Sequence, residues 1–156
     1  MDRIRRDCLG ALAATLALPL AARAAAPLLE VWKDVSCGCC HDWIAHMKAH
    51  GFAVRAYDLG NAAARQRLGV PAQYGSCHTA LVEGYAIEGH VPASEVQRLL
   101  RERPQAVGLV VPGMPIGSPG MDTPAYGGRR DAYAVLLLGK DGSTSVYASY
   151  AARAPG

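Results

Sequence analysis

The alternation of apolar and polar positions predicts short strands and helices that follow one another along the chain. Leu28–Lys33 is short and apolar, as expected for a strand. Residues 40–50 carry apolar side chains at helical spacing and end at Gly51, which is typical of a helix and its stop. Residues 52–59 alternate as a second strand. The further predicted elements are a helix at 61–68 capped by Asn61, strands at 77–83 and 85–88, a helix from residue 92 to before residue 104, and a hairpin of residues 133–138 and 143–150.

The order of these elements indicates the fold class. Strand, helix, strand, helix, strand, strand, helix is the order of a thioredoxin-like domain, in which helices cover the faces of a mixed sheet. Residues 108–128 hold too many prolines and glycines for a helix or a central strand, so they predict a long loop. We therefore expect an α/β fold, a thioredoxin-like mixed sheet flanked by helices, with an added C-terminal loop and β-hairpin.

The first 24 residues are typical of an export signal. Arg3, Arg5 and Arg6 precede a short apolar run, and small residues follow at the positions that an exporting peptidase recognises. The pair Arg5-Arg6 also fits twin-arginine spacing. The run is short for a membrane span, although an uncleaved N-terminal anchor is the alternative. We expect residues 1–24 to be a signal peptide and residues 25–156 to be one domain without a membrane span, exported to the periplasm.

The charge and composition of the chain limit the kinds of partner that the sequence predicts. The net charge of +3 comes largely from the N-terminal arginines, and no basic stripe with interleaved aromatic residues is present. A nucleic acid is therefore not expected as a partner.

The densest chemistry lies in Cys37-Gly38-Cys39-Cys40, where the first strand enters the first helix. Cys37 and Cys40 have the spacing of a thioredoxin-type redox pair, and a helix N-terminus lowers the pKa of thiols. Cys39 adds a third thiol that such a pair does not need. Three clustered thiols favour a site for a soft metal ion, and Cu(I), Zn(II) and iron–sulfur clusters are the candidates that thiolates select.

A second segment, Ser76-Cys77-His78, opens the third predicted strand. In a thioredoxin-like fold this segment runs beside the first helix, so Cys77 is expected to supply a fourth sulfur. Neighbouring residues of a regular strand point to opposite faces, so His78 binds the same metal only where the backbone is irregular. The predicted metal ligands are Cys37, Cys39, Cys40, Cys77 and His78.

Other sulfur and imidazole groups are weaker candidates. Met114 and Met121 lie in the long loop and are either soft Cu(I) ligands or core packing. His46 and His50 share one helix face at a spacing that can bind metal, but a solvated face is the favoured interpretation. His90, in a turn, is expected to act as a capping group or to support a ligand.

Three other hypotheses stay open at this point. A disulfide from Cys37 to Cys40, or one reaching Cys77, would stabilise a small exported domain. A closed zinc site accepts the same ligand types. A thiol–disulfide oxidoreductase would use Cys37 and Cys40 as catalytic residues, so enzymatic activity is left open, with metal binding favoured over turnover.

Four segments together resemble the CopG-type copper-resistance proteins, a family of periplasmic thioredoxin-like domains. They are residues 35–40, 76–80, 87–92 and the loop at 112–121, and they cover the chain after residue 24 in order. The resemblance implies copper bound by the Cys-x-Cys-Cys and Cys-His segments, as a thiolate-bridged cluster of several ions. It also implies redox activity between Cu(II) and Cu(I) in copper tolerance, with metal ions and other periplasmic copper-handling proteins as partners.

Overall fold

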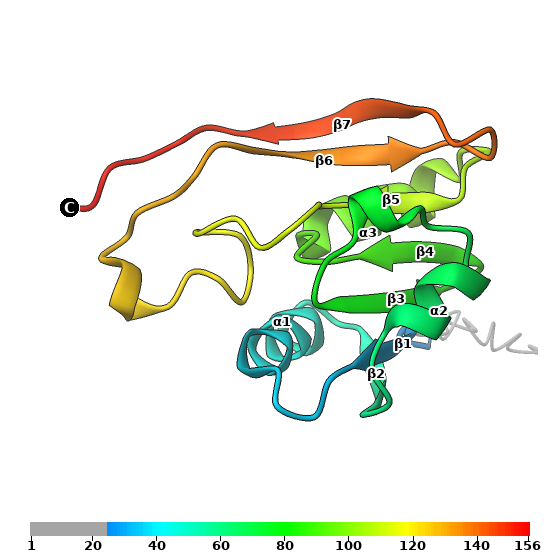
Figure 1. Cartoon of the computed structure of the whole chain (residues 1–156), viewed down its shortest axis with the longest axis horizontal. Coiled ribbons are helices and arrows are strands. Elements are labelled where there is room, and N and C mark those ends of the chain that lie inside the picture. The colour runs from blue at the N-terminus through cyan, green and yellow to red at the C-terminus, as the bar shows by residue number, and fades with distance from the viewer. Residues whose placement is uncertain (1–24) are drawn as a thin grey trace, which may run out of the picture.

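The computed structural model describes residues 25–156, which form one seven-stranded mixed sheet with helices packed beside it (Figure 1). The strand order is β2-β1-β3-β4-β5-β6-β7, and the pairs β1–β2 and β4–β5 are parallel while the others are antiparallel. The strands are β1 Leu28–Lys33, β2 Ala53–Tyr57, β3 His78–Val82, β4 Tyr85–Glu88, β5 Gly108–Val110, β6 Tyr133–Leu138 and β7 Thr144–Tyr150. The helices are α1 Gly38–Ala49, α2 Ala62–Arg67 and α3 Ala93–Glu102, with short 3-10 helices η1 Ala72–Tyr74 and η2 Pro124–Tyr126.

The predicted α/β class is confirmed, with its mixed sheet, flanking helices and added C-terminal hairpin. The hairpin of β6 and β7 extends the sheet on the side of β5, away from α1 (Figure 1). The expected signal peptide falls on residues 1–24, outside the described residues. Within residues 25–156 none of the helices combines the length and the apolar character that a membrane crossing requires.

The core lies where α1 and α3 cover the sheet. Alternate residues of β1 point inward, so Leu29 and Val31 are fully buried. Trp43 and Met47 on α1 are also fully buried, as their helical spacing predicts. The Trp43 Nε1–H donates to the carbonyl oxygen of Val91 at 2.9 Å, which ties α1 to the segment that leads into α3.

One prediction about the long loop is wrong at its start, because residues 108–110 form β5 and pair with β4. Gly108 makes this pairing possible, since a Cβ on this residue would lie 1.7 Å from the carbonyl oxygen of Ala86. The residue that suggested a loop is therefore needed for the close approach of two strands.

The predicted cap of α2 is also different. The Asn61 side chain makes no capping bond; instead its Nδ2 donates to the carbonyl oxygen of Ser76 at 3.0 Å and to the Thr79 hydroxyl at 3.3 Å. Asn61 thus ties the start of α2 to the chain on both sides of Cys77. The adjoining strand β3 begins at His78, one residue later than predicted.

Candidate metal centre

The Cys37–Cys40 segment turns the chain from β1 into α1. Cys37 is the N-cap residue, and α1 begins at Gly38. Cys37 and Cys40 are joined by a disulfide, whereas Cys39 and Cys77 are free thiols. The structure therefore holds the redox-capable pair in its oxidised form, which is one of the alternatives that the sequence left open.

Four cysteine sulfurs nevertheless come together at this point. Those of Cys37, Cys39, Cys40 and Cys77 all lie within 4.8 Å of one another. The Sγ atom of Cys39 is 3.6 Å from that of Cys37 and 3.7 Å from that of Cys77. The expected approach of Cys77 to the Cys-x-Cys-Cys segment is thus present, with Cys39 as the central thiol.

Cys77 and His78 lie side by side because Cys77 precedes the regular strand. Cys77 is in a bend, and the register of β3 begins at His78, opposite Lys33 of β1. The His78 Nδ1 is 3.4 Å from the Cys77 Sγ. His78 is completely buried, and among the described residues its Nε2 atom has no hydrogen-bond partner. An unpaired buried nitrogen is costly unless a further ligand satisfies it.

His90 joins the group, and sequence reasoning did not name it as a ligand. Its Nε2 is 3.1 Å from the Cys77 Sγ, and its Nδ1 is 2.8 Å from the carbonyl oxygen of Pro119. A proton on Nδ1 satisfies that carbonyl and leaves the Nε2 lone pair directed at the sulfur. Cys77, His78 and His90 form a second cluster of donor atoms within 4.8 Å of one another, and Cys77 belongs to both clusters.

Burial sets the protonation of these groups. It lowers the pKa of His78 well below the usual value and also lowers the pKa of His90. Burial, with the neighbouring Cys39 thiol as the next cause, raises the pKa of Cys77 to about 12. The imidazoles are therefore neutral and the Cys77 sulfur keeps its proton. The donor set, sulfur and neutral imidazole with an unpaired buried nitrogen, fits a soft or borderline metal ion.

Comparison with known proteins gives the family. A family model described as a protein of unknown function, DUF411, matches residues 74–121. Two solved structures titled copper resistance protein CopG, form 1 and form 2, are each 48% identical to this chain, with TM-scores of 0.73 and 0.74. The alignments cover 83% and 80% of this chain and 98% of each of the others. The chain belongs to the CopG family of copper-resistance proteins. No curated protein sequence matches it significantly.

The loop after β5 packs against α1 and Ser76, beside the cysteines of this CopG-family chain. Gly120, at φ +83°, packs so closely on α1 that a Cβ would lie 2.6 Å from the Cys39 carbonyl oxygen. The Ser76 hydroxyl donates to the carbonyl oxygen of Gly113 at 2.5 Å, which fastens the other end of the loop. Met114 is 51% exposed and Met121 is partly buried. The methionines thus lie on a loop that borders the site, and their ligation stays a prediction.

The helix histidines have other positions. His46 Nε2 accepts a hydrogen bond from the Ala93 N–H at 3.1 Å, at the first residue of α3. The rings of His46 and His50 lie 4.3 Å apart, and His50 is exposed. His46 is thus half-buried and links two helices, so the solvated position expected for it is wrong, whereas His50 is exposed as expected.

A buried ionic cluster holds the residue before Cys77. Glu88 is fully buried, and its carboxylate accepts hydrogen bonds from Arg65 Nε at 2.8 Å and from the Ser76 N–H at 2.7 Å. The Thr79 hydroxyl donates to its other oxygen at 2.6 Å. A second Arg65 nitrogen donates to the carbonyl oxygen of Ser76 at 2.7 Å. Both polar groups of the Ser76 backbone are therefore fixed, and with them the position of Cys77.

Proposed function

We propose that this chain is an exported copper-binding protein that takes up Cu(I) for copper tolerance. The ligands are Cys37, Cys39, Cys40 and Cys77, with imidazole from His78 and His90. The observation that carries the proposal is the convergence of four sulfurs and two imidazoles around Cys77. The proposal is also supported by two solved structures that are 48% identical to this chain and are titled copper resistance protein CopG.

The shared position of Cys77 argues for more than one ion in each chain. A thiolate can bridge two soft ions, and Cys77 stands between a cluster of sulfurs and a pair of imidazoles. A single closed zinc site needs four ligands. The two clusters together offer six donors, more than one such site uses.

The disulfide gives the proposed site a redox step. Reduced Cys37 and Cys40 would each give one electron to a Cu(II) ion; the S–S bond forms, two Cu(I) ions result, and any thiol protons leave to solvent. Cys39 and Cys77 remain available to hold the reduced product, since neither belongs to the disulfide. Full uptake by all four sulfurs requires the disulfide to be reduced first, because only thiolates are strong ligands.

The test is an anaerobic titration of the reduced domain, residues 25–156, with Cu(I) in the presence of a chromophoric competitor, followed by metal analysis. We expect more than one Cu(I) per chain, with Cys39→Ser and Cys77→Ser each removing about half or more of the bound copper. His50→Gln removes an exposed imidazole of α1 and serves as the control that keeps full stoichiometry. Unchanged copper binding in both cysteine variants, or retention of zinc against excess Cu(I), would overturn the proposal.

A thiol–disulfide oxidoreductase is the second candidate, favoured by the disulfide at the N-terminus of α1. It predicts turnover in an insulin-reduction assay that Cys39→Ser retains and Cys37→Ser loses. Copper binding in the wild type without such turnover would favour the first candidate.

We also propose that residues 1–24 direct export to the periplasm. Cell fractionation of the full chain tests this, with Arg5→Lys combined with Arg6→Lys as the variant. A periplasmic wild type and a cytoplasmic double variant are expected for the twin-arginine route. A wild type retained in the cytoplasm would contradict export.

A further inference from the structure

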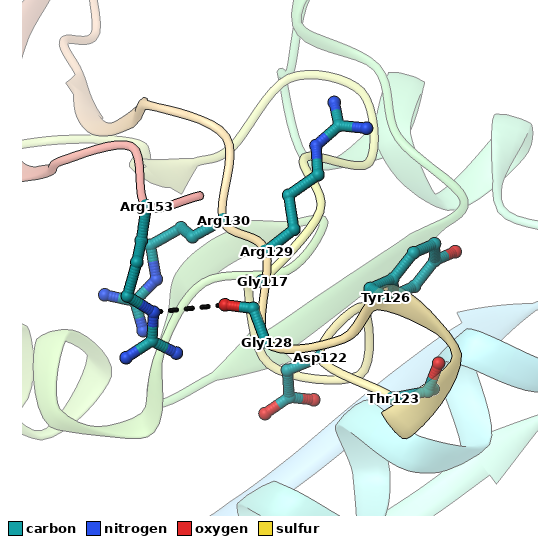
Figure 2. A pocket seen from close by; sticks show the side chains of 8 residues that line it. All are labelled: Gly117, Asp122, Thr123, Tyr126, Gly128, Arg129, Arg130 and Arg153. Atoms are coloured by element: carbon teal, nitrogen blue, oxygen red, sulfur yellow. Dashed lines mark hydrogen bonds between the residues drawn. The ribbon is translucent and has the colours of Figure 1, made fainter. Parts of the chain in front are cut away.

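A pocket of about 190 Å³ lies beside the C-terminal segment, and no cysteine lines it (Figure 2). Gly117 and Thr123 border it from the loop between β5 and η2. Three arginines border it from the chain before β6 and after β7, namely Arg129, Arg130 and Arg153. Such a concentration of positive charge in one small pocket requires an explanation.

The backbone brings two of these arginines face to face. Arg130 and Arg153 form an isolated antiparallel bridge, in which each N–H donates to the other residue's carbonyl oxygen at 2.9 Å. Residues directly opposite in an antiparallel pair place their side chains on the same side, and like charges in this position repel. The two guanidinium groups therefore enter the pocket from one side at an electrostatic cost.

No carboxylate of the described residues forms an ion pair with either of these two arginines. Arg129 pairs with Asp131 at 2.7 Å, whereas neither Arg130 nor Arg153 makes an ion pair within residues 25–156. Arg130 Nε is buried and has no hydrogen-bond partner there, and Arg153 Nε donates only to the carbonyl oxygen of Gly128 at 3.0 Å. The remaining N–H groups of both side chains are free to bind a ligand.

Asp122 and Tyr150 lie near the two arginines, but neither prevents their side chains from binding a ligand. Asp122 lines the pocket, but its Oδ1 accepts the Gly120 N–H at 3.1 Å, and it forms no ion pair with these arginines. The Tyr150 ring lies 6.0 Å from the Arg130 guanidinium carbon, at the outer limit of a cation–π contact.

We propose that the pocket between Arg130 and Arg153 is a binding site for a small oxyanion, a carboxylate or a phosphate. The planar fork of a guanidinium group matches two oxygens of such an anion, and two forks neutralise its charge. Thr123 also lines the pocket. Gly117 leaves the necessary room, because a Cβ there would lie 2.8 Å from the Arg130 Cβ.

The site is separate from the cysteines but shares a loop with them. Gly117 borders the anion pocket, whereas Gly120 packs on Cys39 and Pro119 holds His90. The experiment therefore uses the metal-free domain with its disulfide intact, so that its result does not depend on copper binding.

Binding is measured by isothermal titration calorimetry and by NMR amide chemical shifts, in a low-salt buffer without small oxyanions. One arm titrates inorganic phosphate and the other titrates citrate. Saturable binding of either probe with shifts at Gly128, Arg130 and Arg153 is expected, and the arm that binds identifies the anion class. Arg130→Gln and Arg153→Gln should each weaken binding about tenfold or more, as loss of a charged hydrogen-bond donor predicts.

Arg101→Gln is the matched control, because Arg101 is an exposed arginine of α3 and its loss changes the net charge equally. Arg153 is exposed, so its replacement is compatible with the fold even where Arg130→Gln is not. Absence of binding in both arms, or equal weakening by Arg101→Gln and Arg153→Gln, would overturn the proposal.

Discussion

Replacing Glu88 with glutamine tests whether the buried ionic cluster positions Cys77. The Glu88 carboxylate is completely buried, accepts three hydrogen bonds, and pairs with Arg65, whose side chain is 19% exposed. Burial raises the pKa of Glu88, and the hydrogen bonds from Thr79, Ser76 and Arg65 oppose this effect. The ionised carboxylate therefore depends on its partners.

The expected cost follows from those partners. Glu88→Gln keeps the shape but removes the charge, and its amide nitrogen cannot accept a hydrogen bond as the replaced oxygen does, so we expect a loss of about 1–3 kcal/mol of unfolding free energy. Arg65→Met leaves the carboxylate buried without its cation, which costs about 3–5 kcal/mol in fully buried pairs. Because Arg65 reaches solvent and Glu88 keeps two other donors, we expect the lower end of that range.

Urea unfolding of the oxidised domain measures both variants and the double variant. The pair should show a coupling energy of about 1–3 kcal/mol, since the two side chains are in direct contact. The same proteins, once reduced, should bind Cu(I) more weakly than the wild type, because each variant weakens or removes one of the hydrogen bonds that hold the Ser76 N–H and carbonyl oxygen.

Glu102→Gln is the matched control. Glu102 also accepts from an arginine Nε at 2.8 Å and from the Tyr147 hydroxyl at 2.7 Å, but both side chains of the ion pair are exposed, at 41% and 47%. Solvent screens such pairs, so little change in the unfolding midpoint is expected. Equal midpoint shifts for Glu88→Gln and Glu102→Gln, or additive effects of the Arg65 and Glu88 variants, would refute the assigned role of the cluster.

Two further predictions concern the loop and the core around the site. Gly120→Ala should cost about 2–4 kcal/mol and weaken Cu(I) binding, because its Cβ would meet the Cys39 carbonyl oxygen; Gly113→Ala, at φ +69° in open space, should cost about 1–2 kcal/mol. Thermal unfolding of the two variants compares them, and equal shifts would contradict the close packing. Trp43→Phe should cost about 2–3 kcal/mol in urea unfolding, because the Val91 carbonyl oxygen loses its buried donor. If Trp43→Phe unfolds at the same urea midpoint as the wild type, the hydrogen bond from Trp43 to Val91 contributes nothing to stability.

Local sequence patterns predicted the elements that local interactions specify. The turn at Asp141-Gly142 predicted the β6–β7 hairpin, and the helical spacing of Trp43 and Met47 predicted the buried face of α1. Strand β5 was missed because only its partners make it a strand. Three residues that begin with Gly108 carry no usable period, and β4 and β6 supply their hydrogen bonds from either side.

In the candidate site, too, some residues could be predicted from local sequence and others only from the fold. Cys37, Cys39 and Cys40 are close in sequence, so their proximity needed no fold, and Cys77 followed from the expected element order. His90 needed the strand register as well. Since Thr79 of β3 pairs with Glu88 of β4, the residues just before β3 and just after β4 lie at the same end of the hairpin. The turn at Gly89 then directs His90 back toward Cys77, at 3.1 Å.

The alternation rule that placed Cys77 and His78 on opposite faces applies only within a strand, and the strand begins at His78. Cys77 stands one residue before that limit because Ser76 is bound by Glu88, Arg65 and Asn61 rather than by a neighbouring strand. These three side chains replace the ladder that would otherwise continue β3 and turn Cys77 away. Joint binding of a metal by Cys77 and His78 requires an irregular backbone at Cys77, and we expect the hydrogen bonds to Ser76 to maintain it. The Glu88 variant tests that dependence directly.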